Sequence, residues 1–219
     1  MSAPTRPDGS TTLLVIAKEP VPGRVKTRLT PPFSPEEAAA LAEAALEDTL
    51  RTVLTLPALR RVLVLEGCPG PWTPQGFDVL PQIPGTLDER IAAAFGSCTG
   101  PALLIGMDTP QITPDLLAPA LSPGAWDDCD AWFGPAEDGG FWALGLAAPD
   151  PRLVRGVPMS LPGTGGLQRA RLTDHGLTVR DLPPLRDVDT AGDAAYVAAA
   201  APHGRFARTF TRLSRAEVR

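Results

Sequence analysis

The stretch that decides the fold is residues 12–29, which read TLLVIAKEPVPGRVKTRL. Its apolar first third predicts a short buried strand over residues 12–17. Two prolines and a glycine then prevent a helix, so the strand leads into a stiff, irregular loop. The loop carries four cations and one carboxylate, a net charge of +3, in a chain whose formal net charge is −5. Both lysines of the chain, Lys18 and Lys26, lie in this loop, and the other cationic residues of the chain are all arginines.

A cationic loop at the carboxyl end of a first strand is where an α/β protein binds an anionic ligand. Arginine offers a planar fork of donors and lysine offers a compact charge, and together they suit a diphosphate or a triphosphate. The local sequence leaves one alternative open, which is a solvated basic loop on an otherwise acidic surface.

The composition indicates one α/β domain over residues 12–219. A chain of 219 residues, of which 43% are hydrophobic, can bury a single sizeable core. Residues 1–11 are polar and lack the apolar segment of a signal peptide, so we expect a disordered leader there.

Net charge and cysteine content limit the classes of binding partner and indicate the cellular compartment. The acidic balance disfavours nucleic-acid binding, and no apolar run approaches the roughly 20 residues that cross a membrane. The three cysteines are odd in number and widely spaced, which predicts reduced thiols in a cytoplasmic protein. We therefore expect small-molecule partners, no nucleic acid and no membrane span, and we leave a homodimer open.

Alternating strand and helix signals predict parallel βαβ units in the first half of the chain. A capping box at residues 34–37 opens a long helix to about residue 56, and a second one at 86–89 opens a helix to about residue 95. The remaining elements expected here are strands at 61–66, 77–80 and 101–105 and a helix at 113–121.

The second half is less regular. Strand-like runs occupy residues 131–134 and 141–146, and we expect the second run to form an antiparallel edge of the sheet. Glycines at 163–166 predict a flexible segment before a helix that ends near residue 175. The predicted class is α/β, with a mostly parallel sheet.

The end of the chain predicts three further elements. A late strand is expected at residues 178–182, and an alanine-rich helix follows Thr190 to about residue 201. Residues 203–215 form an amphipathic helix with an apolar and a basic stripe. We expect this helix to dock on its own domain rather than on a membrane or a partner.

Two groups of carboxylates are candidate metal ligands. Asp108 follows a fully apolar run, where strand ends line the ligand crevice of an open α/β sheet. Mg²⁺ takes one or two protein carboxylates, with water and phosphate oxygens completing its shell, so Asp108 with Asp187 or Asp189 would suffice. The alternative for Asp108 is a set of local turn hydrogen bonds. For Asp187 we favour a role in capping the helix that begins near Thr190.

The remaining motifs limit the reaction class. Residues 137–140, Glu-Asp-Gly-Gly, are either an ordinary hairpin turn or a tight loop that meets a substrate. The chain has no P-loop motif, no G-x-G-x-x-G after the first strand and no G-x-S-x-G. Phosphoryl chemistry assisted by a metal and basic groups needs no nucleophile from the protein, and this inventory permits it.

Four motifs occur in an order that resembles one family. They are Lys-x-Pro-x-Pro-Gly-Arg-x-Lys-Thr-Arg-Leu at 18–29, Gly-x-Asp-x-Pro at 106–110, Pro-x-x-Asp-Gly-Gly at 135–140 and Asp-Val-Asp-Thr at 187–190. In these the chain resembles the small bacterial transferases of glycosyltransferase-A fold that are often labelled glycosyltransferases of arsenosugar biosynthesis. More distantly it is similar to the 2-phospholactate and molybdenum-cofactor guanylyltransferases. The resemblance covers about residues 12–200.

This resemblance implies a Rossmann-like, three-layer sandwich of nucleotide-diphospho-sugar transferase type that uses Mg²⁺ or Mn²⁺. The metal pair would be Asp108 and Asp189, and the catalytic residues would be Lys26, Asp108 and Asp138. The acceptor would meet Asp138, Gly139, Gly140 and Phe141. The nucleotide would meet Ala17, Lys18, Gly23, Arg24, Lys26, Thr27, Arg28, Gln82, Gly85 and Thr86, with the last three beside the base.

The chain departs from the family pattern mainly on the acceptor side. The aromatic pair after Asp-Gly-Gly, often two tyrosines, is Phe141-Trp142 here. Where a Trp-Ser/Thr-Thr segment is expected, the chain has residues 159–161, Met-Ser-Leu.

Three functions follow from these residues. The family labels favour glycosyl transfer from a nucleotide sugar to a small-molecule acceptor, and this is the function that we expect first. The +3 loop favours nucleotidyl transfer, in which a nucleoside triphosphate reacts with a phosphorylated small molecule and pyrophosphate leaves. A non-catalytic nucleotide-binding protein is the third reading, and the acidic positions beside the basic loop count against it.

Overall fold

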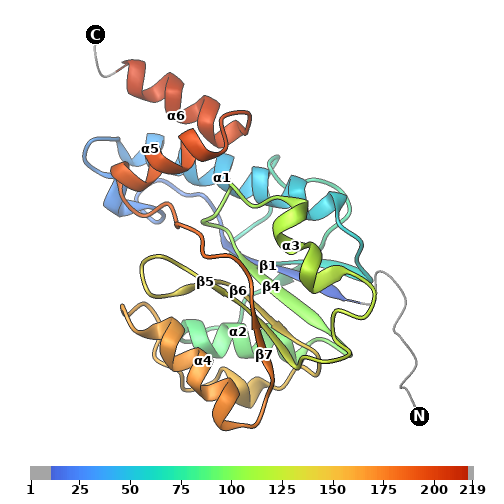
Figure 1. Ribbon diagram of the computed structural model, residues 1–219. Helices are drawn as coiled ribbons and strands as arrows, with labels where there is room; N and C mark the ends of the chain where they lie inside the picture. Colours follow the sequence, from blue (N-terminus) through green and yellow to red (C-terminus); the bar gives the residue numbers. More distant parts are fainter. Residues whose placement is uncertain (1–10, 217–219) are drawn as a thin grey trace.

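The computed structural model describes residues 11–216 (Figure 1). The expected leader over residues 1–11 therefore lies outside the described residues except for Thr11. The chain folds around one seven-stranded sheet with the order β3-β2-β1-β4-β6-β5-β7. The strands are β1 (Thr12–Lys18), β2 (Arg60–Glu66), β3 (Asp78–Pro81), β4 (Ala102–Gly106), β5 (Ala131–Pro135), β6 (Phe141–Leu146) and β7 (Val179–Asp181).

The α/β class with a mostly parallel sheet is confirmed. The antiparallel strand is β6, but it lies between β4 and β5 instead of at an edge of the sheet. The physical reason is the short turn at residues 136–140, which makes β5 and β6 a hairpin and places β6 beside β4. The edges of the sheet are the short strands β3 and β7.

Helices cover both faces of the sheet. They are α1 (Pro35–Thr55), α2 (Leu87–Gly96), α3 (Pro114–Leu121), α4 (Thr164–Asp174), α5 (Ala191–Ala200) and α6 (Arg205–Ala216). Single 3-10 turns occur at Thr27–Leu29 and Pro151–Leu153. In Figure 1, α1, α5 and α6 lie on one side of the sheet, and α2 and α4 lie on the other.

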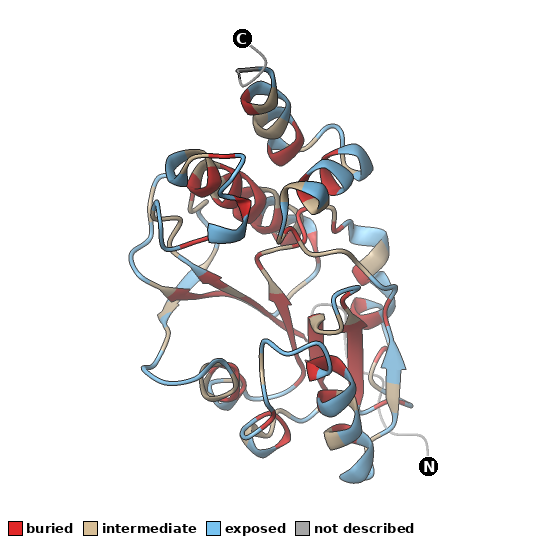
Figure 2. Ribbon diagram, turned by 90° about the vertical axis from the view of Figure 1, so that its left-hand side faces the viewer, coloured by how far each residue is buried: buried red, intermediate tan, exposed pale blue. Residues whose placement is uncertain are grey.

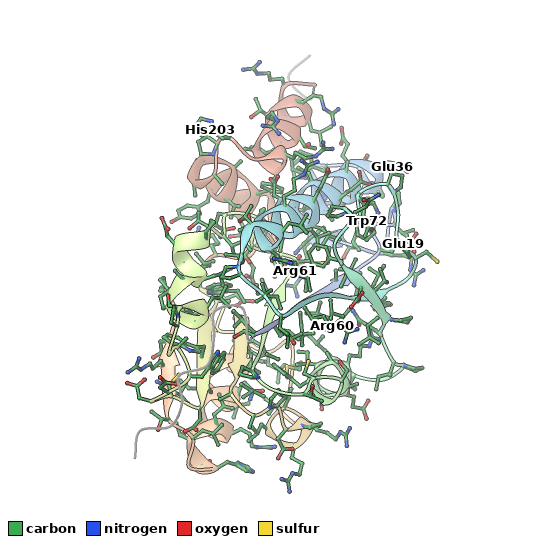
Figure 3. The ribbon with its side chains drawn as sticks, turned by 90° about the vertical axis from the view of Figure 1, so that its right-hand side faces the viewer. Glu19, Glu36, Arg60, Arg61, Trp72 and His203 are labelled. Atoms are coloured by element: carbon green, nitrogen blue, oxygen red, sulfur yellow. The ribbon has the colours of Figure 1, made fainter. Side chains whose placement is uncertain are left out.

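Local sequence explains where the long helices begin. The Ser34 hydroxyl accepts a hydrogen bond from the backbone N–H of Glu37 (3.2 Å), and the Glu37 carboxylate accepts one from the N–H of Ser34 (2.9 Å). This is the expected capping box of α1. At the other end of α1, the Arg61 guanidinium donates to the carbonyl of Val53 (3.1 Å) and to that of Leu56; Arg61 is labelled in Figure 3.

The glycine-rich segment before α4 differs from the prediction of flexibility, because α4 begins at Thr164 and includes Gly165 and Gly166. The Thr164 hydroxyl donates to the carbonyl of Pro158 (2.9 Å) and accepts from the N–H of Leu161 (3.1 Å). These bonds tie down the turn that precedes the helix. Of these glycines, Gly165 serves close packing, because a Cβ there would collide with the carbonyl oxygen of Gly140.

The core forms because side chains alternate along the buried strands. On β1, Leu13 and Val15 pack with α1 and α3, whereas Leu14 packs with α2 and α4 on the opposite face. Figure 2 shows the central strands as buried, with exposed outer faces on the surrounding helices. The sheet therefore holds the carboxyl ends of β1 and β4 side by side.

The amphipathic helix α6 packs on α1 and α5. Phe206 and Leu213 are buried in this contact, and Phe210 meets the ring of Phe33 edge-on with centroids 5.9 Å apart. Arg205 forms an ion pair with Glu47 of α1, at 2.5 Å. Within residues 11–216, no helix has both the length and the apolar character that crossing a membrane requires.

We predict that Phe206→Ala lowers the free energy of unfolding by about 3–5 kcal/mol, because it leaves a cavity between three helices. Urea denaturation followed by circular dichroism measures this change. The control is Leu59→Ala, whose side chain is 65% exposed and should cost less than about 1 kcal/mol. Equal effects of the two variants would contradict a stabilising role for the α6 contact.

Candidate active site

A cavity of about 620 Å³ opens at the carboxyl ends of β1 and β4. Its walls come from the loop after β1, the end of β4, the start of β6, residues 159–164 and residues 187–189. A smaller hollow of about 210 Å³ adjoins it and shares Lys18, Arg24 and Val25. This location matches the crevice where open α/β sheets bind ligands.

The loop after β1 is anchored at its start by Glu19, which is labelled in Figure 3. The backbone N–H of Glu19 donates to the carbonyl of Glu66 (2.8 Å), and its carboxylate accepts from the N–H of Cys68 (2.9 Å). Gly23 then turns the chain with a φ of +75°, which glycine adopts without strain. All four cations that line the cavity come from this loop.

Lys26 lies at the centre of the site. Its Nζ is 2.8 Å from Oδ1 of Asp108 and 3.2 Å from Oδ1 of Asp189, and its side chain is only 9% exposed. The backbone of Lys26 has a φ of +49°, a left-handed conformation that costs a non-glycine residue on the order of 1 kcal/mol. Burial by itself would lower the pKa of Lys26, but the two carboxylates raise it above its usual value, so the ammonium stays charged.

The backbone brings the two carboxylates together. Asp108 follows β4 and Asp189 precedes α5, so 80 residues lie between them in the chain. The N–H of Val188 donates to the carbonyl of Asp108 (3.0 Å), and the Val188 side chain is buried among α1, α5 and α6. The acidic motifs predicted from sequence therefore meet at one edge of the sheet.

The helix-capping role predicted for Asp187 is wrong. Thr190 caps α5 instead, with Asp193 completing a capping box. Asp187 lines the cavity, and its buried Oδ1 has no hydrogen-bond partner among the described residues. Burial first, and then the negative charge of Asp108 and Asp138, raise the pKa of Asp187 to about 7.

The other cations of the loop form long, exposed ion pairs. Lys18 and Arg24 lie 3.7 and 3.9 Å from the Glu66 carboxylate, and their side chains are 55% and 71% exposed. Arg28 lies 3.5 Å from Asp189 and is 77% exposed. Exposed pairs of this kind contribute about 0–1 kcal/mol each, so these side chains are free to turn toward an anion.

Gln82 lines the cavity, but its side-chain amide already forms hydrogen bonds within the protein. Its Nε2 donates to the carbonyls of Ala17 (2.8 Å) and Val64 (3.1 Å), and its Oε1 accepts from Arg90 (3.3 Å). Arg90 is in turn paired with Glu66. Gln82 therefore ties the ends of β1 and β2 together beside the cavity. Gly85 and Thr86, predicted beside the base, begin α2 and do not line the cavity.

The predicted acceptor residues form the opposite wall. The Asp138 carboxylate accepts from the N–H of Gly140 (2.8 Å), which closes the turn, and Gly140 and Phe141 face the cavity. Gly139 has a φ of +89° and does not line the cavity. A Cβ at Gly139 would collide with the carbonyl oxygen of Pro162, so this position needs glycine to pack the turn against residues 158–164.

The structure thus unites most of the predicted site residues around one cavity. Those that line it are Ala17, Lys18, Arg24, Lys26, Thr27, Arg28, Gln82, Asp108, Asp138, Gly140, Phe141 and Asp189. Gly23, Gly85, Thr86 and Gly139 support its walls without lining it. Sequence reasoning gave no role to Arg90 or Glu66, and no local motif signals that pair, because Arg90 lies on α2 and Glu66 at the end of β2, and only the folded chain brings them together.

The donor set fits a divalent cation. Asp108 and Asp189 already hold one cation between them, the Lys26 ammonium, and hard carboxylate oxygens are what Mg²⁺ and Mn²⁺ bind. Within residues 11–216, no group of three or more His, Cys, Asp or Glu side chains is arranged to hold a metal by itself. Water molecules and phosphate oxygens of a ligand would therefore complete the shell.

We predict that Asp187→Asn makes the protein more stable above about pH 7 and leaves it unchanged near pH 4. The folded pKa of Asp187, about 7, lies above the ordinary value of 3.8. Stability from the protonated carboxyl is therefore complete at low pH and is lost as the pH rises toward 7. At pH 8 the asparagine variant should gain about 2–4 kcal/mol.

Thermal unfolding between about pH 4 and pH 8, in metal-free buffer, measures this difference. The matched control is Asp174→Asn, an exposed carboxylate at the end of α4. This variant gives the baseline for an aspartate-to-asparagine change outside the cavity. If Asp187→Asn gained no stability between pH 4 and pH 8 relative to this baseline, Asp187 would be ionised at neutral pH.

Comparisons with known proteins agree with this architecture. A phosphoenolpyruvate guanylyltransferase of Salinispora arenicola (strain CNS-205) is 35% identical over 187 residues, which cover 80% of this chain and 83% of that protein. A 2-phospho-L-lactate guanylyltransferase of Natrialba magadii is 28% identical over 211 residues, covering 86% of each chain.

A solved structure shares both the fold and nearly the full length of the chain. It is described as a nucleotide-diphospho-sugar transferase of Desulfovibrio desulfuricans G20 and has a TM-score of 0.81, with 25% identity and 96% of each chain covered. Residues 40–161 match the family described as "Uncharacterized protein conserved in bacteria (DUF2064)". The chain belongs to this family and is a transferase with the nucleotide-diphospho-sugar transferase fold.

Proposed function

We propose that the protein is a metal-dependent nucleotidyltransferase that joins a nucleoside triphosphate to a phosphorylated small molecule and releases pyrophosphate. The observation that carries this proposal is the composition of one wall of the cavity. Lys18, Arg24 and Arg28 are exposed there, beside the ion pairs that the nearly buried Lys26 forms with Asp108 and Asp189. The guanylyltransferase relatives support the same reaction class.

The cationic wall suits a triphosphate and its leaving group. In the reaction, an oxygen of the acceptor phosphate attacks the α-phosphorus and forms a new P–O bond. The bond from the α-phosphorus to the bridging oxygen breaks, and its electron pair leaves with pyrophosphate. Arg24 and Arg28 can exchange their exposed carboxylate partners for phosphate oxygens and so stabilise the charge that builds on the leaving group.

A divalent cation held by Asp108 and Asp189 would neutralise further charge on the phosphates. The other residues of the site position the reactants. The turn closed by Asp138 and Gly140 presents the acceptor wall, and the Gln82 amide keeps the ends of β1 and β2 in register. We also place the enzyme in the cytoplasm, since Cys68, Cys98 and Cys129 are free thiols.

Glycosyl transfer from a nucleotide sugar is the second candidate, and one observation favours it. The acceptor wall, from residues 138–142 and 159–164, contributes no lysine or arginine to the cavity. Phe141, Met159 and Leu161 make it partly apolar. A neutral hydroxyl acceptor fits such a wall better than a second phosphate does. The solved structure with a TM-score of 0.81 is also described as a nucleotide-diphospho-sugar transferase.

A donor panel separates the two candidates. We expect nucleoside triphosphates with Mg²⁺ to raise the melting temperature more than any nucleotide sugar does, because bound ligand stabilises the folded state. A coupled assay for pyrophosphate, run with phosphorylated three-carbon acids as acceptors, then tests turnover. Stabilisation by a nucleotide sugar alone, with no pyrophosphate formed from any triphosphate, would replace this proposal by glycosyl transfer.

We predict that Asp108→Ala abolishes metal-dependent nucleotide binding, measured by isothermal titration calorimetry with Mg²⁺ and the preferred nucleotide. The loss should be at least about 100-fold in affinity, since one of two metal carboxylates is removed. The control is Asp115→Ala, which removes an exposed carboxylate from the first turn of α3. If Asp108→Ala bound the metal nucleotide as tightly as the control did, Asp108 would not belong to the site.

A further inference from the structure

We propose that Lys26 is a built-in counter-ion that occupies the divalent-cation position of the nucleotide-free enzyme and moves to the phosphates when the metal nucleotide binds. The metal then enters together with the nucleotide and not before it. This inference rests on the proposed function in one respect, namely that the cavity binds a metal nucleotide.

The first step of the argument is spatial. The Lys26 ammonium lies 2.8 Å from Asp108 and 3.2 Å from Asp189, in contact with one oxygen of each carboxylate. A Mg²⁺ ion bound by the same two oxygens would lie about 2.0–2.1 Å from each of them. The ammonium and the metal would therefore occupy the same space between the carboxylates, and one excludes the other.

The second step is electrostatic. The Lys26 side chain forms ion pairs with both carboxylates, so its positive charge lies between two negative charges. With Lys26 in place, the group formed by Lys26, Asp108 and Asp189 has a net charge of −1. Without the ammonium the two carboxylates have a charge of −2, which attracts a divalent cation much more strongly in a partly buried site. Nucleotide-free protein should therefore bind metal weakly.

The third step is that the bound nucleotide offers the Lys26 ammonium a second set of partners. It belongs to the same loop as Arg24 and Arg28, which line the cavity, so a bound polyphosphate would lie within reach of all three side chains. Turning the flexible lysine side chain exchanges two carboxylate partners for phosphate oxygens, so the charge keeps a partner in both states. Without a nucleotide, the Lys26 ammonium lies between the two carboxylates on a left-handed backbone with a φ of +49°.

The two lysines of the chain provide a matched pair of variants. Lys26→Met removes the buried ammonium. Lys18→Met removes the same charge from the same loop, but the Lys18 side chain is 55% exposed and pairs with Glu66 instead. Isothermal titration calorimetry with Mn²⁺ alone measures metal binding by both variants without nucleotide. Circular dichroism confirms that each variant is folded.

We expect Lys26→Met to bind Mn²⁺ alone at least about tenfold more tightly than the unsubstituted protein does. Lys18→Met should change this affinity by less than about threefold, because its charge is exposed and screened. With a non-hydrolysable triphosphate present, the sign reverses, and Lys26→Met should bind the metal nucleotide more weakly. If the only role of Lys26 were to bind phosphate, replacing it by methionine would not tighten the binding of metal alone.

Two different results would overturn the counter-ion role of Lys26 and the proposed function, respectively. Binding of Mn²⁺ alone by Lys26→Met that is no tighter than in the unsubstituted protein would overturn the counter-ion role. Failure of the unsubstituted protein to bind any metal nucleotide would overturn the proposed function. In that case tighter binding of Mn²⁺ alone by Lys26→Met would still support the exclusion of metal by the lysine.

A second measurement needs no change at Lys26. Protein labelled with ¹³C at the lysine ε-carbons has two side-chain signals, since the chain has two lysines, and Lys18→Met assigns them. We expect the Lys26 signal to stay in place with millimolar Mg²⁺ alone and to shift when the metal and the triphosphate analogue are added together. A Lys26 signal that stays in place with saturating metal nucleotide would show that the side chain does not move.

Discussion

The ion pairs of Lys26 with Asp108 and Asp189 are the interaction on which the site depends. They join the loop after β1, the end of β4 and the segment before α5. The Lys26 side chain is nearly buried, so its charge needs a partner, and the two partly exposed carboxylates at the edge of the sheet supply it. The hydrogen bond from Val188 to the carbonyl of Asp108 fixes the acidic side of this contact (3.0 Å). Lys26, whose backbone has a left-handed φ of +49°, provides the basic side.

Around this centre the cavity has two unlike walls. One wall carries exposed cations whose weak pairs with Glu66 and Asp189 leave them free to bind phosphate. The other wall carries a glycine turn, Asp138 and partly apolar side chains. This division explains why the site indicates the class of nucleotide donor more specifically than it indicates the acceptor. Polyphosphate recognition needs concentrated positive charge, whereas many acceptors fit a wall that is neutral or mildly acidic.

Most of the elements were predictable from sequence, because capping boxes and apolar runs act locally. The capping box at Ser34 starts α1 where expected, and the apolar run before Asp108 is β4. The exceptions depend on contacts between distant segments. The strand β6 is interior because it pairs with both β4 and β5. The glycines near residue 165 start a helix because the turn before it is pinned by Thr164.

By itself, the sequence determined the fold class, the concentration of positive charge after the first strand and the order of the acidic motifs. These follow from periodicity and residue type, which need no knowledge of contacts. Only the tertiary structure decided that the Lys26 ammonium lies between Asp108 and Asp189, that Asp187 is half-buried beside them, and that the Gln82 amide donates to backbone carbonyls. The reason is physical: burial and charge pairing depend on distances between segments that the chain brings together only when it folds.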